Sequence, residues 1–341
     1  MRIFLSLVFL ICLAAGGWLY WALWLPVSPP ANTFVLLPTG SSTRRIASEL
    51  RYQGVIRNAD AFVVWHYLHR KRSLKAGEYL FDKPASAREV HDRLASGDIY
   101  FHTVLIPEGY NMFEIAKAIQ DAGLGSSQEF VNIAMSDTSL IADIDPEAKS
   151  LEGFLFPNTY EFTRTQSMHD MAAAMVKQFR QVAAEIGLTP GPVAGFSRQA
   201  TLAENEMESV VTLASIIEKE TAAPGERPHV ASVYYNRLEK HIPLQADPSV
   251  IYAEELQGQY GGRLHHADMQ FDSLYNTYTH AGLPPGPIAN PGRTSLEAAM
   301  HPAHTDDYYF VSDGNGHHRF AHDLEEHNRN VAAYRKAVNG R

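Results

Sequence analysis

Residues 213–221 read LASIIEKET, and this stretch decides how the chain around it has to fold. Its leucine and two isoleucines recur at the spacing of one helix face, which predicts a helix packed into a core. Glu218 and Glu220 follow directly after these apolar residues. On a helix over 208–221 neither glutamate lies on the polar stripe, so we expect both carboxyls to be partly buried.

The polar stripe of this predicted helix consists of Glu208, Thr212, Ser215 and Lys219. We expect the stripe on the solvent face of the helix. A partly buried carboxyl has its charged form destabilised, so its pKa rises toward neutrality and the group can serve as a general acid. The alternative is that both glutamates reach water at a frayed helix end, or that one of them pairs with Lys219 or with an arginine.

The N-terminal stretch predicts a membrane anchor. Residues 3–26 read IFLSLVFLICLAAGGWLYWALWLP and contain no charged side chain. At about 1.5 Å per helical residue, this run is long enough to cross the ~30 Å hydrocarbon core of a bilayer. Arg2 precedes the run and the next basic residue is Arg44. This asymmetry predicts a cytoplasmic N-terminus and export of everything after the anchor.

The competing interpretation is a cleaved signal peptide, because Ala14, Ala15 and Gly16 are small enough for a cleavage site. The apolar run continues beyond them through three tryptophans and a tyrosine, a composition typical of an interfacial aromatic belt. We therefore expect an uncleaved anchor, with residues 1–30 forming the transmembrane helix and a proline-rich linker.

Composition limits the partners and the chemistry. The chain has 341 residues, of which 45% are apolar and 20% charged, and a formal net charge of −9. This length fits about two globular domains besides the anchor. The net negative charge and the lack of a long basic run argue against nucleic acid as a partner. The single cysteine, Cys12, lies in the apolar run, so we expect no intramolecular disulfide and no cysteine zinc site.

A repeat follows the linker. Residues 36–56, LLPTGSSTRRIASELRYQGVI, align without gaps with residues 105–124, LIPEGYNMFEIAKAIQDAGL. Each copy predicts a strand, a glycine turn and an amphipathic helix that ends at glycine. Such βα modules resemble LysM carbohydrate-binding domains, so we expect a LysM-like module over 31–150. A spacer without sugar contacts is the alternative. Pro38 matches Pro107, Gly40 matches Gly109, and Gly54 matches Gly123.

The chain changes in character from residue 151 onward. LEGFLFPNTYEF (151–162) alternates aromatic residues like a half-buried strand, with a turn at its Pro-Asn pair. The segment GLPPGPIANPG (282–292) predicts a fixed irregular loop of the kind that lines sites. We predict an α+β fold: the transmembrane helix, the LysM-like βα module and an α+β catalytic domain over 151–341. Long helical patterns in this last part cover about 167–187, 200–221 and 226–240.

Five segments in register resemble a known family. They are LEGFLFPNTYEF, LASIIEKET, VYYNRLEKHIPLQADPSVIYA, YNTYTHAGLPPGPIANPGRTSLEAAMHP and YYFVSDGNGHHRFAHDLEEHN. Together they look like the MltG-type (YceG-like) endolytic murein transglycosylases. The match runs in order from about Leu36 to the C-terminus. One departure lies in FAHDLEEHN, where the family pattern suggests a small hydroxyl residue near Asp323.

The resemblance implies a reaction and a residue that performs it. The family cuts the β-1,4 bond between N-acetylmuramic acid and N-acetylglucosamine, and the matching glutamate is Glu218. Periodicity alone does not choose Glu218 over Glu220, which becomes either a neighbour that keeps Glu218 protonated or a structural group. One acid suffices: it protonates the glycosidic oxygen and then takes a proton from the substrate's own C6 hydroxyl as that oxygen attacks. The product carries a 1,6-anhydro-muramyl end, and neither cofactor nor metal is required.

Further polar residues fall in matching family motifs, and we expect them to bind substrate or to support the site. Amide and carboxylate groups suit sugar hydroxyls and acetamido groups, and each residue equally suits a role in fixing a loop. These residues are Asn236, Gln245, Asp247, Asn290 and His318.

Histidines offer the rival chemistry. His318 and His322 are four residues apart, a spacing that can ligate zinc on a helix. Gly314 and Gly316 favour a loop or strand at His318, and neither a cysteine nor an HExxH motif lies nearby. We therefore predict no metal site and expect both histidines to order a substrate loop.

Two functional classes remain open. The first is an enzyme anchored in the bacterial inner membrane, with its catalytic part in the periplasm. Its substrate would be the glycan strands of peptidoglycan, its implied partners the penicillin-binding synthases, and its role the termination of nascent strands. The second is a non-catalytic peptidoglycan-binding scaffold at the cell-wall synthesis machinery. The intact Glu218 favours the enzyme.

The predicted topology can be tested with protease added to spheroplasts. Because the chain beyond about residue 30 should lie outside the membrane, the protease should degrade it, as followed by a C-terminal tag. A C-terminus that stays protected until the membrane is permeabilised would contradict this orientation.

Overall fold

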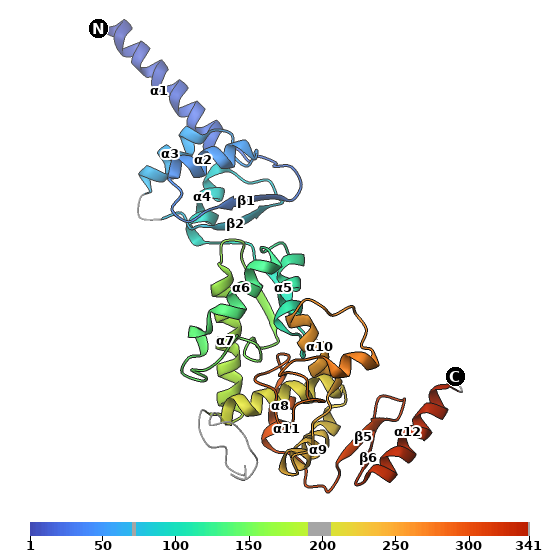
Figure 1. The fold of residues 1–341 in the computed structure, drawn as a ribbon. Coiled ribbons are helices and arrows are strands. Elements are labelled where there is room, and N and C mark those ends of the chain that lie inside the picture. The colour runs from blue at the N-terminus through green and yellow to red at the C-terminus, as the bar shows by residue number, and fades with distance from the viewer. Residues whose placement is uncertain (70–72, 190–205, 340–341) are drawn as a thin grey trace. The chain divides into compact units, whose positions relative to one another are not determined.

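The computed structural model describes residues 1–69, 73–189 and 206–339 (Figure 1). The chain forms two compact units. Unit 1 comprises Met1–Thr103, Ala122–Leu124 and Glu161–Ser167, and unit 2 comprises Val104–Asp121, Gly125–Tyr160 and Met168–Arg341. The described residues form helices and three two-stranded sheets, which confirms the predicted α+β class.

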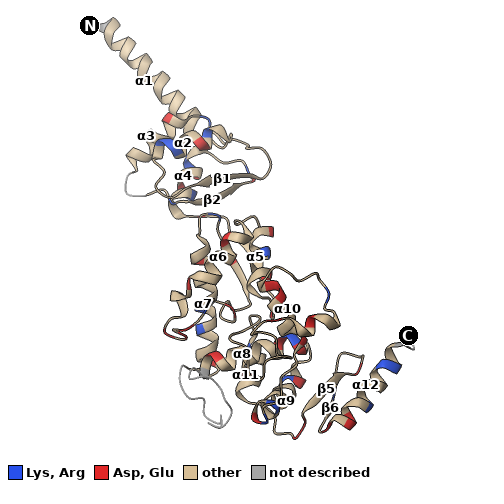
Figure 2. Cartoon of the chain, viewed as in Figure 1, with Lys and Arg blue, Asp and Glu red and all other residues tan. Residues whose placement is uncertain are grey.

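Unit 1 begins with the apolar helix. The 21-residue stretch Ile3–Leu23 of this helix has a mean hydropathy of 2.2 and is long enough to cross a membrane. It carries no charged residue (Figure 2). The elements that begin in unit 1 are α1 (Arg2–Leu23), β1 (Thr33–Leu37), α2 (Thr43–Tyr52), α3 (Ala59–Leu68), β2 (Gly77–Phe81), α4 (Ala87–Ser96) and β3 (His102–Leu105).

The core of unit 1 lies between its small sheet and its helices. β1 and β2 pair antiparallel, with Val35 opposite Tyr79. Burial alternates along β1, so that Val35 and Leu37 face the core. Side chains cap the helices as their sequences predict: the Ser86 hydroxyl accepts a hydrogen bond from the Glu89 N–H, and the Glu89 carboxylate accepts one from the Ser86 N–H.

The two copies of the repeat have the same local structure. In each copy a strand leads through a glycine turn into a helix, β1 into α2 and β3 into α5 (Met112–Asp121). The matched glycines share the left-handed backbone that glycine adopts without strain: φ is +80° at Gly40 and +77° at Gly109, and +73° at Gly54 and +70° at Gly123. The predicted strand–turn–helix repeat is therefore confirmed, whereas its likeness to LysM modules stays a prediction.

The remaining elements begin in unit 2. This unit contains residues 105–121 of the second copy of the repeat, so residues 104–121 and 125–150 belong to the same compact unit as most of 151–341. The functional division into 1–30, 31–150 and 151–341 stays a prediction. The helices and strands are α5, α6 (Ser127–Ser136), β4 (Thr159–Phe162), α7 (Met168–Glu185), α8 (Glu206–Glu220), α9 (Arg227–Glu239), α10 (Asp247–Leu256), α11 (Arg293–Met300), β5 (Tyr309–Ser312), β6 (His318–Ala321) and α12 (Leu324–Asn339), with short 3-10 turns at Thr138–Ile141, Pro224–Glu226 and His266–Gln270.

Two expectations about unit 2 were wrong. Only the last four residues of LEGFLFPNTYEF form a strand, β4, which pairs with β3. The residues before it form buried turns, in which the Leu155 N–H donates to the Asn290 side chain instead of to a neighbouring strand. The solvent face predicted for the polar stripe of α8 is also wrong for two of its four residues, although Lys219 is exposed. Thr212 and Ser215 are buried, and the Ser215 hydroxyl donates to the Thr212 carbonyl and accepts from the Ile288 N–H.

α8 is the central helix of unit 2. It packs against α9, α10 and α11, and its residues Leu213, Ile216 and Ile217 are fully buried. Helices cover α8 on several sides, so its hydroxyl groups are buried in the core of unit 2. They are tolerated there because they hydrogen-bond to nearby groups. The predicted start of this helix at residues 200–205 lies outside the described residues. Its end at Glu220 is followed by Thr221 and, after two alanines, by Pro224, which cannot continue a helix.

Substitution of Gly153 tests how closely the turn at residue 153 is packed against the loop 282–292 and against α8. Its φ is +88°, and a Cβ there would lie 2.6 Å from the Pro287 Cβ and 2.8 Å from the Val211 Cγ1. Gly153→Ala should therefore lower the free energy of unfolding by about 2–4 kcal/mol, from backbone strain and overpacking together.

The matched control is Gly187→Ala. Gly187 has a φ of +75°, and no atom of the described residues lies within 4 Å of the point that an alanine Cβ would occupy there. This variant should cost only the backbone contribution, about 1–2 kcal/mol. Equal losses for the two variants in urea unfolding would contradict the close packing.

Candidate active site

The end of α8 directs its two glutamates into different surroundings. Glu218 and Glu220 are two residues apart, so they point to different sides of the helix. Both carboxyls are largely buried, as the apolar pattern of α8 predicts. Lys219 between them donates from its Nζ to the Gly109 carbonyl oxygen at 3.1 Å. The second copy of the repeat is therefore in direct contact with the end of α8.

Glu218 is held by charge-assisted hydrogen bonds. Its Oε1 accepts from Arg227 Nη2 at 2.8 Å, and its Oε2 accepts from the Gly292 N–H at 2.9 Å. The Glu218 side chain is 5% exposed and the Arg227 side chain 6%. Bonds of this kind fix the orientation of both carboxylate oxygens. The arrangement matches one of the alternatives for these glutamates, a pair with an arginine.

A second carboxylate lies at the same guanidinium. The Glu108 Oε2 is 3.8 Å from Arg227 Nη1, and the Glu108 side chain is 51% exposed. Burial and then the negative charge of Glu218 raise the pKa of Glu108, while Arg227 lowers it. The cluster of Glu108, Glu218 and Arg227 thus holds two carboxylates and one cation. Solvent reaches the cluster at Glu108, its half-exposed member.

Two glycines lie against the carboxylate side chains of Glu108 and Glu218. A Cβ at Gly292 would overlap the Glu108 carboxylate, and a Cβ at Gly109 would lie 3.3 Å from the Glu218 Cγ. Gly109 also has a left-handed φ of +77°. The left-handed backbone at Gly109 therefore favours glycine, and a side chain at Gly292 would displace Glu108 from its present position.

Glu220 lines a cavity of about 390 Å³. The pKa of Glu220 is raised to about 7, mainly by burial and to a smaller extent by the charge of Asp247, against the lowering effects of a hydrogen bond with the Tyr234 hydroxyl and of the charge of Arg237. Four of the residues predicted for the site come together here, namely Glu220, Gln245, Asp247 and His318.

The polar groups of the Glu220 cavity are fixed by their neighbours. The Asp247 Oδ1 accepts a hydrogen bond from the Tyr278 hydroxyl, and the Gln245 N–H donates to the Thr277 carbonyl. Gln245 has a φ of +54°, an uncommon value for a residue with a side chain. Such a backbone persists only where the surroundings enforce it.

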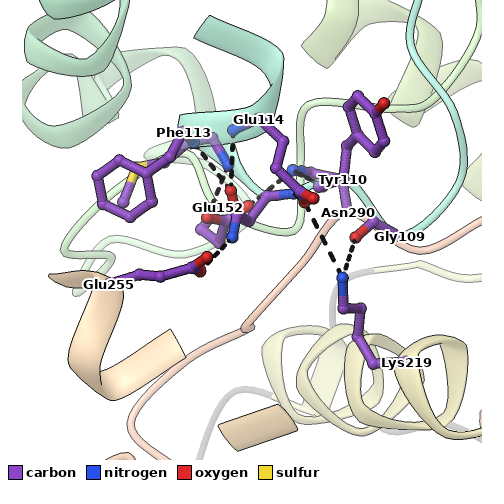
Figure 3. A network of polar contacts seen from close by, with 10 residues as sticks. Gly109, Tyr110, Phe113, Glu114, Glu152, Lys219, Glu255 and Asn290 are labelled. Carbon is purple, nitrogen blue, oxygen red and sulfur yellow. Dashed lines mark hydrogen bonds and ion pairs between the residues drawn. The ribbon is translucent and has the colours of Figure 1, made fainter. Parts of the chain in front are cut away.

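Asn290 lies in a buried network away from this cavity (Figure 3). Its Oδ1 accepts from the Leu155 N–H at 2.8 Å, and its Nδ2 donates to the Tyr110 carbonyl at 3.0 Å and to Glu152 Oε1 at 2.7 Å. Burial raises the pKa of Glu152 to about 8. Asn290 thus fixes the loop 282–292 to the start of α5 and to the turn at residue 152, which positions Gly292 beside Glu218.

Asn236 and His318 also hold loops. Asn236 Nδ2 donates to the carbonyl oxygens of Thr305 and Asp307 at 2.8 and 2.9 Å. His318 Nδ1 lies 2.8 Å from Glu226 Oε2, and its N–H donates to the same carboxylate. His318 begins the strand β6, as its flanking glycines predict. Within the described parts of the chain, no cluster of three His, Cys, Asp or Glu side chains is arranged to hold a metal ion.

Glu108 and Arg227 were missed by the sequence analysis. A signal was available for Glu108: the aligned repeats read LLPTG and LIPEG, so Glu108 replaces Thr39 in the copy that reaches α8. Arg227 carried no such signal, since an arginine at a helix start is common on protein surfaces. The structure places it nine residues after Glu218, at the first residue of α9.

Two buried carboxyls at a helix end, one of which shares a guanidinium with the half-exposed Glu108, define a site suited to acid–base chemistry. The sequence profile of the YceG-like family matches residues 35–333. The chain therefore belongs to the YceG-like family, and the resemblance inferred from the sequence motifs is confirmed.

Known relatives agree with this assignment. The chain is 34% identical over 332 residues to a Bacillus subtilis (strain 168) protein named endolytic murein transglycosylase, covering 92% of this chain and 88% of that protein. A Streptococcus pneumoniae (serotype 2, strain D39) protein of the same name is 30% identical over 369 residues, and the match spans 64% of its length. A crystal structure of a YceG-like protein from Listeria monocytogenes superimposes with a TM-score of 0.57 at 32% identity, over 87% of this chain and 98% of that one.

The raised pKa of Glu220 makes a pH-dependent prediction. A carboxyl with a raised pKa in the folded state contributes stability below its ordinary pKa of 4.5, and this contribution is lost as the pH rises toward 7. Between these pH values, the wild-type chain should lose about 1–3 kcal/mol of unfolding free energy relative to Glu220→Gln.

The control for this measurement is Glu185→Gln, because hydrogen bonds from Gln181 and Arg293 lower the pKa of Glu185 instead of raising it. This variant should not reproduce the relative loss in urea unfolding. Parallel pH profiles for the wild type and Glu220→Gln would show that the carboxyl is not held in its neutral form.

Proposed function

We propose that the chain is a peptidoglycan lytic transglycosylase that cuts the MurNAc–GlcNAc β-1,4 bond and leaves 1,6-anhydroMurNAc ends. Membership of the YceG-like family and the names of the relatives support this activity. The structural observation that carries the proposal is the carboxylate cluster at the end of α8, in which Glu218 and Glu108 share the guanidinium of Arg227.

Glu218 is the proposed acid–base residue. Two carboxylates beside one guanidinium carry one excess negative charge, so the pair favours the uptake of a single proton. Glu108, whose pKa is raised, would hold this proton with Glu218 in the free enzyme. Arg227 and the Gly292 N–H fix the orientation of Glu218 and stabilise its carboxylate after it has given up the proton.

The reaction needs one proton to move twice. Glu218 donates it to the glycosidic oxygen as the bond from that oxygen to the anomeric carbon breaks. The C6 hydroxyl oxygen of the same muramyl residue then bonds to the anomeric carbon, and its proton returns to the glutamate. No water is consumed, which distinguishes this chemistry from hydrolysis with two carboxylates in separate roles.

Glu220 is the second candidate for the acid, and a specific observation favours it. It lines a cavity with Gln245 and Asp247, and burial raises its pKa to about 7, which suits a proton donor at neutral pH. In the proposal it is the neighbouring carboxyl, which shapes the electrostatics of the helix end. Gln245, Asp247 and His318 would contact sugar groups from the same cavity, whereas Asn236 and Asn290 would position loops.

The anchor and the repeat complete the proposal. α1 would hold the enzyme in the bacterial inner membrane with its N-terminus in the cytoplasm, so that the catalytic part acts in the periplasm on nascent strands beside the penicillin-binding synthases. The LysM-like stretch, residues 31–150, would bind glycan, and its second copy would also supply Glu108. The alternative function is a scaffold that binds peptidoglycan at the synthesis machinery without cutting it.

A pair of variants tests the assignment. Glu218→Gln keeps the shape of the side chain but cannot donate a proton at neutral pH, so the release of anhydro-muropeptides from purified sacculi should fall about 10²–10⁴-fold. Glu220→Gln should reduce the release less. Circular dichroism of both variants checks that each remains folded.

The opposite ranking, with wild-type release by Glu218→Gln and loss by Glu220→Gln, would move the acid to the Glu220 cavity. Wild-type release by both variants would refute the site at the end of α8. Binding of sacculi by the wild-type chain without any release would favour the scaffold.

A further inference from the structure

The last turn of α1 is part of the core of unit 1. Ala22 and Leu23 are 1% and 3% exposed, and Leu19 packs against the same core. The membrane-crossing stretch Ile3–Leu23 therefore ends inside the globular unit. Because the end of α1 is packed into the core, no free linker separates the helix from unit 1. Unit 1 therefore has to lie close to the membrane surface at which α1 leaves the lipid.

Helix α3 is fixed beside this end of α1. The Trp24 and Trp65 rings meet edge to face at a centroid distance of 5.2 Å. The Arg57 guanidinium lies 5.6 Å from the centre of the Trp21 ring and donates from Nη2 to the Pro26 carbonyl at 2.9 Å. Tryptophans 18, 21 and 24 form the aromatic belt expected at a membrane interface. Trp65, one turn before the end of α3, lies at the level of that belt.

The second half of α3 exposes apolar side chains. Val64, Tyr67 and Leu68 are 45%, 53% and 74% exposed, and their spacing of three and four residues places them on one helix face. The first half is packed more closely, with Ala61 and Phe62 fully buried, and Asp60 at its start is exposed on the same face as Val64. A helix that packs on one side and still exposes a stripe of large apolar residues on the other presents a surface for a partner.

We propose that the stripe of Val64, Tyr67 and Leu68 on α3 seats unit 1 in the phospholipid interface of the membrane that α1 crosses. The inference rests on the proposed anchoring of α1. The stripe continues the apolar surface of α1 and its tryptophan belt, and amphipathic helices lie in this way at the headgroup boundary.

This seating would give the enzyme a fixed height. If α1 alone held unit 1, the unit would tilt together with that helix, whereas a second contact beside the first restricts the tilt of unit 1 against the bilayer. In this arrangement unit 1 serves as a membrane-bound base from which the chain continues into unit 2.

The experiment uses the full chain in vesicles of phosphatidylethanolamine and phosphatidylglycerol. A nitroxide is attached at one cysteine at a time: at the native Cys12 in α1, or at Leu68→Cys or Leu36→Cys in a Cys12→Ser background. Leu36 is the matched control, an exposed leucine of the same unit on β1, 43% exposed. Figure 1 draws β1 and β2 on the side of unit 1 away from α1.

Collision rates with oxygen, which dissolves in lipid, and with a water-soluble nickel chelate report the depth of each label. Labels at Cys12 and at Leu68→Cys should collide more with oxygen than with the chelate, and the label at Leu36→Cys should show the reverse. A label at Leu68→Cys that behaves like the control, while Cys12 lies in lipid, would overturn the seating of α3 and leave the anchor intact. A water-exposed Cys12 would overturn the anchor and the seating together.

Discussion

The guanidinium of Arg227 is the point at which the candidate active site is held together. It is buried, it pairs with Glu218, and it lies within ion-pair distance of Glu108. Breaking a buried pair by removing one partner costs about 3–5 kcal/mol, because it leaves an uncompensated charge. Three parts of unit 2 distant in the sequence meet there: the turn after β3, the end of α8 with the start of α9, and the loop at Gly292. Arg227 contacts the first two parts through Glu108 and Glu218, and Glu218 in turn binds the Gly292 N–H.

Helix periodicity then separates two carboxyls that are neighbours in the sequence. Glu218 points to the cation and to a backbone N–H, which bind its two oxygens, whereas Glu220 points into a cavity where burial favours the neutral form. Both environments arise because α8 is enclosed by other helices up to its last turn. Pairs of carboxyls whose surroundings differ in this way are a common source of acid and base roles in glycan-cleaving enzymes.

The sequence predicted the parts of the fold that depend on local chemistry. The strand–turn–helix repeat followed from its matched prolines and glycines, and the burial of Glu218 followed from the apolar pattern of α8. The solvent face assigned to Thr212 and Ser215 was wrong. A hydroxyl that hydrogen-bonds to its own helix or to a nearby loop can be buried, so a polar residue in the sequence does not by itself indicate an exposed position. Arg227 could not be predicted, since its role depends on a contact between α8 and α9 that no local spacing encodes. The buried role of Asn290 likewise depends on three segments meeting in space.

The central claim is that the carboxylate cluster transfers a proton within the substrate without using water. Digestion of purified sacculi in water labelled with heavy oxygen tests it most directly, with mass analysis of the new muropeptide ends. The account predicts 1,6-anhydro ends that contain no heavy oxygen. Reducing ends that carry the label would show that water attacks the anomeric carbon and would contradict the proposed chemistry.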